Sequence, residues 1–296
     1  MKDWAEFLRA ISALLWPTLG FVALFVLKAE LKDLLNRVRK GKVLGQEIEL
    51  SESLEKLSAS AEKTASEVAA LPPAPPAALP AADSLTADSA LEREVLGELG
   101  RSPKAALMLL ASGMEREVRQ LLASMGRLDP RRPLSFPQAI QVLDESGGLL
   151  RHVAGSVDQF WSVRNRLVHG RSASDEDIIR AIDSGLVILR TIKGIPHEQN
   201  VVHHPGVEVF SDREGKTLRA GVRAIVLETT SPGGAKTTRR VYPTTRTHFE
   251  KGMRVAWDWS FDLGWGESWY RDPHSGLIEY GWTSSAEFIG RDLNDI

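Results

Sequence analysis

The chain begins with an apolar segment that carries no charged residue from Ala10 to Leu27. Eighteen residues at the helical rise span about 27 Å, which is close to the thickness of the hydrocarbon core of a bilayer. A secretory signal peptide would end in a small-residue cleavage site, which the following residues, KAELKDLL, do not offer. The pattern therefore predicts a transmembrane helix over residues 10–27 after a short tail at 1–9.

Residues 28–70 continue with helical spacing and predict a basic juxtamembrane helix and a stalk. Its first half either lies along an anionic membrane surface or simply extends the spanning helix. Its second half has apolar or small residues at steps of four and three, which indicates a weak coiled coil or a single solvated helix. These heptad positions are Leu50, Leu54, Leu57, Ala61, Thr64 and Val68.

A spacer separates this stalk from the rest of the chain. The stretch LPPAPPAALPAA at residues 71–82 contains five prolines, which preclude a helix and favour an extended conformation. We therefore expect residues 71–88 to form a semi-rigid linker.

Residues 89–195 show the period of amphipathic helices with short connections, which predicts an antiparallel all-α bundle. Ser102 and Pro103 mark one helix start, and Gly126 marks its end. Further helices are expected from Ser135, from about Leu149 and from Ser174, where three acidic residues suit the helix dipole.

From about residue 201 the period changes to two, and residues 201–296 predict a small all-β domain, a sandwich or a barrel. Val255, Trp257, Trp259 and Phe261 alternate with polar or small residues, which indicates a strand with one buried face. The sequence DPHSG at 272–276 predicts a hairpin turn. The tryptophans are interpreted as a core, with a binding face for a partner or ligand as the alternative.

Composition and charge narrow the classes of function. The net charge of −2 excludes a broadly cationic wrapper of nucleic acid, so that a polyanion site must be a local patch. The chain has no cysteine, which removes disulfides and thiolate metal sites. Two basic residues precede the apolar segment and six follow it closely, which places the N-terminus outside and the remaining domains in the cytoplasm.

One helix of the predicted bundle carries a candidate site. Arg164 projects from the centre of an apolar stripe formed by Leu150, Val153, Val157, Phe160, Trp161 and Leu167. A guanidinium there is costly unless it is paired or lines a polar cleft. Glu115 and Glu117 are the candidate partners of a purely structural ion pair. Asn165 and His169 are four residues apart and share one flank of the same helix.

These residues stand in the string WSVRNRLVHG, which resembles the signature of the HEPN superfamily: an arginine, usually a polar residue beside it, and a histidine a few residues later. Arg164, Asn165 and His169 match it, and SPKAALMLLASGMEREVRQLL at 102–122 is similar to the long second helix of bacterial HEPN-like domains. The resemblance covers about residues 89–195.

The resemblance implies a metal-independent endoribonuclease in which two copies of the motif face one cleft. His169 would move a proton at the ribose 2′-hydroxyl or at the leaving oxygen, since imidazole suits acid–base work near neutrality. Arg164 would hold the scissile phosphate, and Asn165 would orient either group. Arg166, Arg171 and Arg151 would add RNA contacts.

Two functions from different classes therefore remain open. The first is a membrane-anchored HEPN-like ribonuclease that acts as a homodimer on RNA, for example in bacterial stress or phage defence. The second is a non-catalytic, membrane-tethered dimerisation or sensor protein whose β domain binds an unidentified protein or ligand. No cofactor is expected, and no metal, because the histidines lack ligand spacing with carboxylates.

Overall fold

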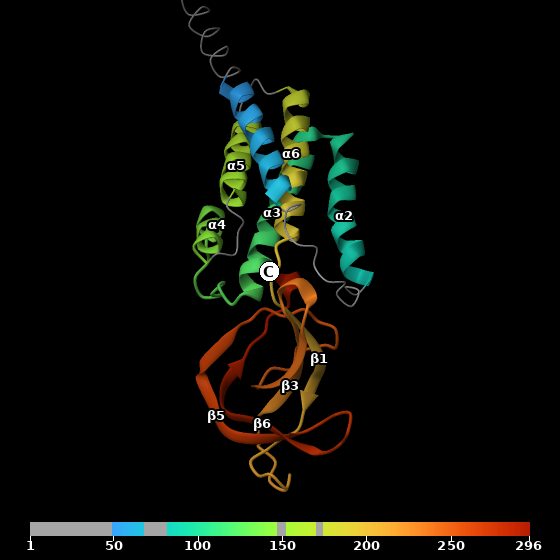
Figure 1. The fold of residues 1–296 in the computed structure, drawn as a ribbon, viewed down its shortest axis with the longest axis vertical. Coiled ribbons are helices and arrows are strands. Elements are labelled where there is room, and N and C mark those ends of the chain that lie inside the picture. Colours follow the sequence, from blue (N-terminus) through green and yellow to red (C-terminus); the bar gives the residue numbers. More distant parts are fainter. Residues whose placement is uncertain (1–48, 68–81, 147–151, 170–173) are drawn as a thin grey trace, which may run out of the picture. The chain divides into compact units, whose positions relative to one another are not determined.

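The computed structural model describes residues 49–67, 82–146, 152–169 and 174–296. Helices come first and strands follow (Figure 1). Residues 49–67 are helical and are called helix 49–67 below. The later helices are α2 (Ala82–Leu99), α3 (Pro103–Ser124), α4 (Phe136–Glu145), α5 (Val153–His169) and α6 (Asp175–Lys193).

The fold class predicted from the sequence, a transmembrane helix followed by an all-α bundle and a small all-β domain, needs correction. Among the described residues, no helix has the length and apolar character needed to cross a bilayer. What they form is a set of helices and two three-stranded sheets. The predicted span at 10–27 lies outside the described residues. The single-pass membrane localisation rested on that span and is corrected with it.

The physical weakness of that prediction is its use of hydropathy. An apolar run reports that a segment prefers apolar surroundings, and a protein interior supplies such surroundings as well as a bilayer does. The length of the run, at the lower limit for a spanning helix, and its lack of a polar face favoured the bilayer.

Local sequence signals set the ends of the bundle helices. Ser102 caps α3 by accepting a hydrogen bond from the backbone N–H of Ala105 at 3.3 Å, and Pro103 is the first helical residue. At the start of α6, Ser174 and Asp177 form a reciprocal capping box. The predicted starts of these helices are thus confirmed.

The core of the bundle lies around α3, which contacts α2, α4, α5 and α6. Fully buried side chains of α3 and α5 meet at Gly185 of α6. A Cβ atom added there would lie 2.5 Å from Cε2 of Phe160 and 2.8 Å from Cδ2 of Leu110. Glycine at this position therefore allows α6 to pack tightly against both neighbours.

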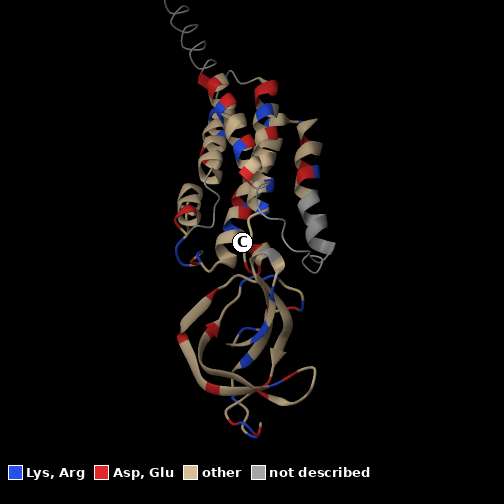
Figure 2. Ribbon diagram, in the orientation of Figure 1, with Lys and Arg blue, Asp and Glu red and all other residues tan. Residues whose placement is uncertain are grey.

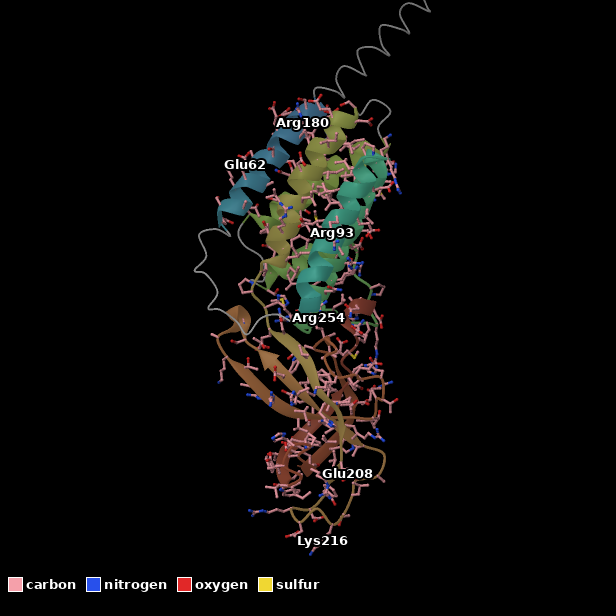
Figure 3. The ribbon with its side chains drawn as sticks, turned by 90° about the vertical axis from the view of Figure 1, so that its right-hand side faces the viewer. Glu62, Arg93, Arg180, Glu208, Lys216 and Arg254 are labelled. Atoms are coloured by element: carbon pink, nitrogen blue, oxygen red, sulfur yellow. The ribbon has the colours of Figure 1, made fainter. Side chains whose placement is uncertain are left out.

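Helix 49–67 packs on α5 in the antiparallel sense. Ser60 and Thr64 contact Ser156 of α5 through their hydroxyl groups, at 2.6 and 2.8 Å. The heptad positions from Leu54 to Thr64 are buried by this chain itself, whereas Glu62 points away from the bundle (Figure 3). The seam that predicted a coiled coil is therefore covered without a second copy.

Two three-stranded antiparallel sheets form the C-terminal part. The first has the order β1 (Gln199–Val207), β3 (Arg223–Thr230), β4 (Thr237–Thr244), and the second β2 (Val209–Phe210), β5 (Trp259–Arg271), β6 (Ile278–Phe288). Central strand β3 is buried on both faces, because Ala224 and Val226 belong to one apolar cluster and Ile225 and Leu227 to another. The 272–276 turn is present, with Gly276 at φ 69°.

The strand predicted around Trp257 is wrong in its start and, at Phe261, in its buried face, whereas Val255, Trp257 and Trp259 do pack in an apolar cluster. β5 begins only at Trp259, and the side chain of Phe261 is 86% exposed. The pairing of β5 with β6 shifts between Ser260 and Gly264, and the intervening residues leave the ladder. A shift of register moves side chains to the other face, which local alternation does not reveal.

Three hydrogen bonds join segments beside the strands to α3 and to the loop that follows it. The backbone N–H of Trp257 donates to the Ala123 carbonyl at 2.8 Å, and Gln120 donates to the Leu293 carbonyl at 2.7 Å. Arg291 donates to the Leu128 carbonyl at 3.1 Å and also pairs with buried Asp258. Ala123 belongs to the last turn of α3, where carbonyls lack intrahelical partners, and Trp257 gives it a donor in addition to the backbone N–H of Gly126.

Gly185→Ala tests the close packing of α6. We expect the free energy of unfolding to fall by about 1–3 kcal/mol, since the added methyl group overlaps Phe160 and Leu110. Gly97→Ala in α2 is the matched control, because a Cβ there meets nothing within 4 Å. It should leave stability unchanged or raise it by about 1 kcal/mol in urea unfolding of the full chain. Equal effects of both substitutions would contradict the packing described.

Candidate functional site at the end of helix α5

The three motif residues lie on the last two turns of α5. Val157, Phe160 and Leu167 are fully buried, and α5 packs against α3, α4 and α6 through this face. That packing leaves Asn165 and His169 exposed and Arg164 half-buried. The direction of the three polar side chains therefore follows from the burial of the apolar stripe.

Arg164 is held by neutral groups. Its Nη1 donates to Oδ1 of Asn165 at 2.8 Å, and its guanidinium carbon lies 5.1 Å from the ring centre of Trp161. Trp161 in turn packs on Phe136 of α4, with ring centres 4.2 Å apart. The Nε atom of Arg164 is buried and has no hydrogen-bond partner among the residues that the structure describes. These contacts orient the guanidinium without neutralising its charge.

The structural ion pair considered from the sequence does not form among the described residues. Glu115 pairs instead with Arg119 one turn later, at 2.8 Å, and Oε1 of Glu117 lies 3.8 Å from the ammonium of Lys193. No carboxylate of the described part of the chain pairs with Arg164. An anion supplied from outside would therefore meet an uncompensated positive charge at this position.

His169 is the last residue of α5 and is exposed. Asn165 stands one turn before it, so the two lie on one flank of the helix. Asn165 is also the hydrogen-bond partner of Arg164 and thereby links the guanidinium to the flank that carries the imidazole. A charged donor and a titratable group on one helix are the residue types needed for acid–base chemistry on an anion.

Of the three other arginines predicted to contact RNA, Arg166 alone lies among the described residues. Arg166 donates to Oγ of Ser53 at 3.2 Å and so reaches towards helix 49–67. Arg151 and Arg171 lie outside the described residues. Figure 2 shows acidic and basic residues interspersed along the helices, so the structure offers no broad basic face in that view. At the end of α5, phosphate recognition by the described residues thus rests chiefly on Arg164.

The aromatic cluster of the β domain is packed as a core. Tyr242 lies edge-on to Trp257 and to Trp259, with ring centres 5.6 and 5.4 Å apart, and both tryptophans pack on buried Phe288. Burial raises the pKa of the Tyr242 hydroxyl. These contacts support the core interpretation of Trp257 and Trp259. Within the described ranges no three His, Asp or Glu side chains are grouped as metal ligands would be.

Comparison of the chain with models of known families, with curated proteins and with solved structures finds no match. The HEPN resemblance therefore stays a prediction that rests on Arg164, Asn165 and His169 and on the helix ahead of them.

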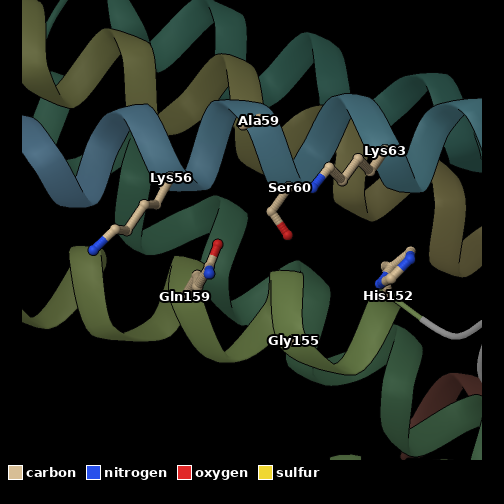
Figure 4. Close-up of a pocket in the computed structure, with 7 residues that line it drawn as sticks. All are labelled: Lys56, Ala59, Ser60, Lys63, His152, Gly155 and Gln159. Carbon is tan, nitrogen blue, oxygen red and sulfur yellow. The ribbon is translucent and has the colours of Figure 1, made fainter.

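Sequence reasoning missed a cavity between helix 49–67 and α5. It is lined by Lys56, Ala59, Ser60, Lys63, His152, Gly155 and Gln159 (Figure 4). The available signal was the spacing of Lys56, Ser60 and Lys63 on one face of their helix, beside the heptad seam. The missing information was which helix would face them.

Arg164→Met tests whether the guanidinium has a structural role. We expect the free energy of unfolding to stay unchanged or to rise by about 1 kcal/mol, because methionine keeps the apolar stem and removes a buried donor without a partner. Urea unfolding of the full chain measures this change.

Arg291→Met is the matched comparison for that measurement. It should cost about 3–5 kcal/mol, because it leaves Asp258 buried without its cation. A loss of more than about 2 kcal/mol for Arg164→Met would assign Arg164 to structure and contradict its availability to a ligand.

Proposed function

We propose that this chain is a metal-independent endoribonuclease of the HEPN type, with Arg164, Asn165 and His169 as its reactive set. The observation that carries the proposal is the burial of the Arg164 guanidinium and the identity of its partners. Its guanidinium lies half-buried on an apolar face, oriented by Asn165 and Trp161 and paired with no carboxylate of the described residues. A planar guanidinium that is oriented in this way, and that no carboxylate of the described residues binds, is suited to binding a phosphate.

The chemistry follows from the groups available. The ribose 2′-oxygen attacks phosphorus while the bond from phosphorus to the 5′-oxygen breaks, which gives a 2′,3′-cyclic phosphate and a 5′-hydroxyl end. One imidazole accepts the proton of the 2′-hydroxyl, and the leaving 5′-oxygen needs a proton from an acid. Arg164 donates to the phosphoryl oxygens, on which negative charge grows in the transition state.

A homodimer fits this requirement for both a base and an acid. One motif offers one histidine, whereas two motifs facing each other offer two imidazoles and two guanidiniums. The exposed position of His169 at the helix end is compatible with its meeting a second copy. Activity per chain should therefore rise with protein concentration until the dimer is saturated.

Incubation of the full-length chain with end-labelled RNA in excess EDTA tests the activity. We expect cleavage with 2′,3′-cyclic phosphate products, and none of DNA of the same sequence, which lacks the attacking hydroxyl. His169→Ala and Arg164→Ala should each lower the rate by at least about 100-fold, as expected for loss of an acid–base group or of a charge-stabilising donor.

Matched controls are His274→Ala and Arg101→Ala, which alter exposed residues of the same types outside the site. Both should retain the wild-type rate. Cleavage that survives the two motif substitutions would remove the mechanism. An absence of cleavage by the wild-type dimer on diverse RNAs would favour a binding role for the bundle.

A further inference from the structure

Strand β5 carries an aromatic side chain that the described part of the chain leaves uncovered. Phe261 is 86% exposed, and it lies in the segment between Ser260 and Gly264 where β5 leaves its ladder with β6. Next to it, the backbone N–H of Asp262 donates to Oγ of Ser260, and that hydroxyl donates to Oδ2 of Asp262, both at 3.3 Å. The phenyl ring is therefore open to a ligand, and covering it would remove apolar surface from water.

A turn with two arginines follows α3, and Figure 2 shows basic residues on this loop. Its sequence is Asp129-Pro130-Arg131-Arg132-Pro133. Oδ1 of Asp129 accepts a hydrogen bond from the backbone N–H of Arg131 at 2.8 Å, and the Asp129 carbonyl accepts one from the N–H of Arg132 at 3.2 Å. Each proline fixes its own φ angle. The turn therefore presents its arginines on a backbone that has little freedom.

An ion pair joins this arginine turn to the β5 segment. Nη2 of Arg131 lies 3.3 Å from Oδ2 of Asp262. Asp262 thereby offsets the charge of Arg131, whereas the exposed guanidinium of Arg132 pairs with no carboxylate of the described residues. The open ring and the available cation are thus carried by the neighbours of one ion pair, Phe261 beside Asp262 and Arg132 beside Arg131.

The arginine turn also leads to the candidate site on α5. It continues into α4, whose first residue, Phe136, packs on Trp161 with ring centres 4.2 Å apart. The guanidinium of Arg164 lies over the same Trp161 ring. Four residues of chain lead from Arg132 to Phe136, and at full extension they cover only about 14 Å. A single strand of a few nucleotides can therefore span from the turn to Arg164.

The surroundings of the ring favour a nucleic acid over a protein partner. Phe261 and Leu263 are the large exposed apolar side chains of this β5 segment, and charged residues lie beside them. Two such side chains fall far short of the apolar centre of a stable protein interface. An open aromatic ring next to a cation is instead the combination that binds unpaired bases and their phosphates.

We propose that Phe261 and the arginine turn bind the RNA substrate as a single strand. An unpaired base stacks on the Phe261 ring, and Arg132 pairs with a phosphate of the same strand. The bases of a duplex are already stacked on each other, so the site selects single strands. The choice of RNA as the ligand rests on the proposed ribonuclease function, whereas binding itself needs neither His169 nor cleavage.

Fluorescence anisotropy of the full-length chain with a labelled single strand of 2′-O-methyl RNA tests the site. This probe lacks the attacking hydroxyl and is bound without being cleaved. Phe261→Leu keeps an apolar side chain but removes the ring, and it should raise Kd at least about fivefold through loss of one base–aromatic stack. Phe261→Trp keeps a ring and should not raise Kd. A duplex of the same sequence should bind the wild type at least about fivefold more weakly.

Arg132→Gln tests the phosphate contact. It should raise Kd and lower the slope of log Kd against log salt concentration by about 0.7, the value for one phosphate contact on a single strand. Tyr280→Leu and Arg213→Gln are the matched controls, because they make the same changes at exposed residues elsewhere in the β domain. Both should leave Kd unchanged.

Wild-type Kd in Phe261→Leu or in Arg132→Gln, equal affinity for the duplex, or no saturable binding by the wild type would each overturn the site. Unchanged Kd together with loss of self-association of Phe261→Leu in sedimentation would assign the segment to an interface between copies instead. RNA binding that depends on Phe261, without any cleavage, would refute the ribonuclease and keep the site. Cleavage together with binding that is independent of Phe261 would do the reverse.

Discussion

The packing of α5 into the bundle is the constraint on which the candidate site depends. Val157, Phe160 and Leu167 are buried against α3, α4 and α6, and this fixes how the helix is rotated. Arg164 falls within the same stripe and is held half-buried between Asn165 and Trp161. A mobile surface arginine would lose conformational entropy on binding a phosphate, whereas one already oriented loses less.

Helix 49–67 supports this helix directly, whereas the C-terminal part is joined to α3. Helix 49–67 runs along α5 from Ser53, beside Arg166, to Glu67, beside His152. On α3, the sheets are joined at Ala123 and Gln120, and Gly126 at φ 69° brings its backbone against Trp257. The proposed RNA site at the end of α5 and the cavity lined by Gly155 and Gln159 therefore occupy different stretches of α5.

Features that depend on neighbouring residues were predictable from the sequence, and those that depend on distant pairing were not. Ser102 and Ser174 were recognised as caps because capping involves residues three apart. The exposure of Phe261 follows from a register shift against β6, which no local pattern encodes. The hydroxyl contacts of Ser60 and the 53–166 contact join residues about a hundred positions apart. Hydropathy alone led to the membrane prediction that the structure corrects.

The central claim is that the guanidinium of Arg164, which pairs with no carboxylate of the described residues, receives the RNA phosphate. The most direct measurement is the side-chain Nε–H resonance of Arg164 in a nitrogen–proton spectrum, assigned by its absence in Arg164→Met. Titration with 2′-O-methyl RNA, which binds but lacks the attacking hydroxyl, should shift this resonance in a saturable manner. An unchanged Arg164 resonance while other arginine resonances shift on RNA binding would contradict the account.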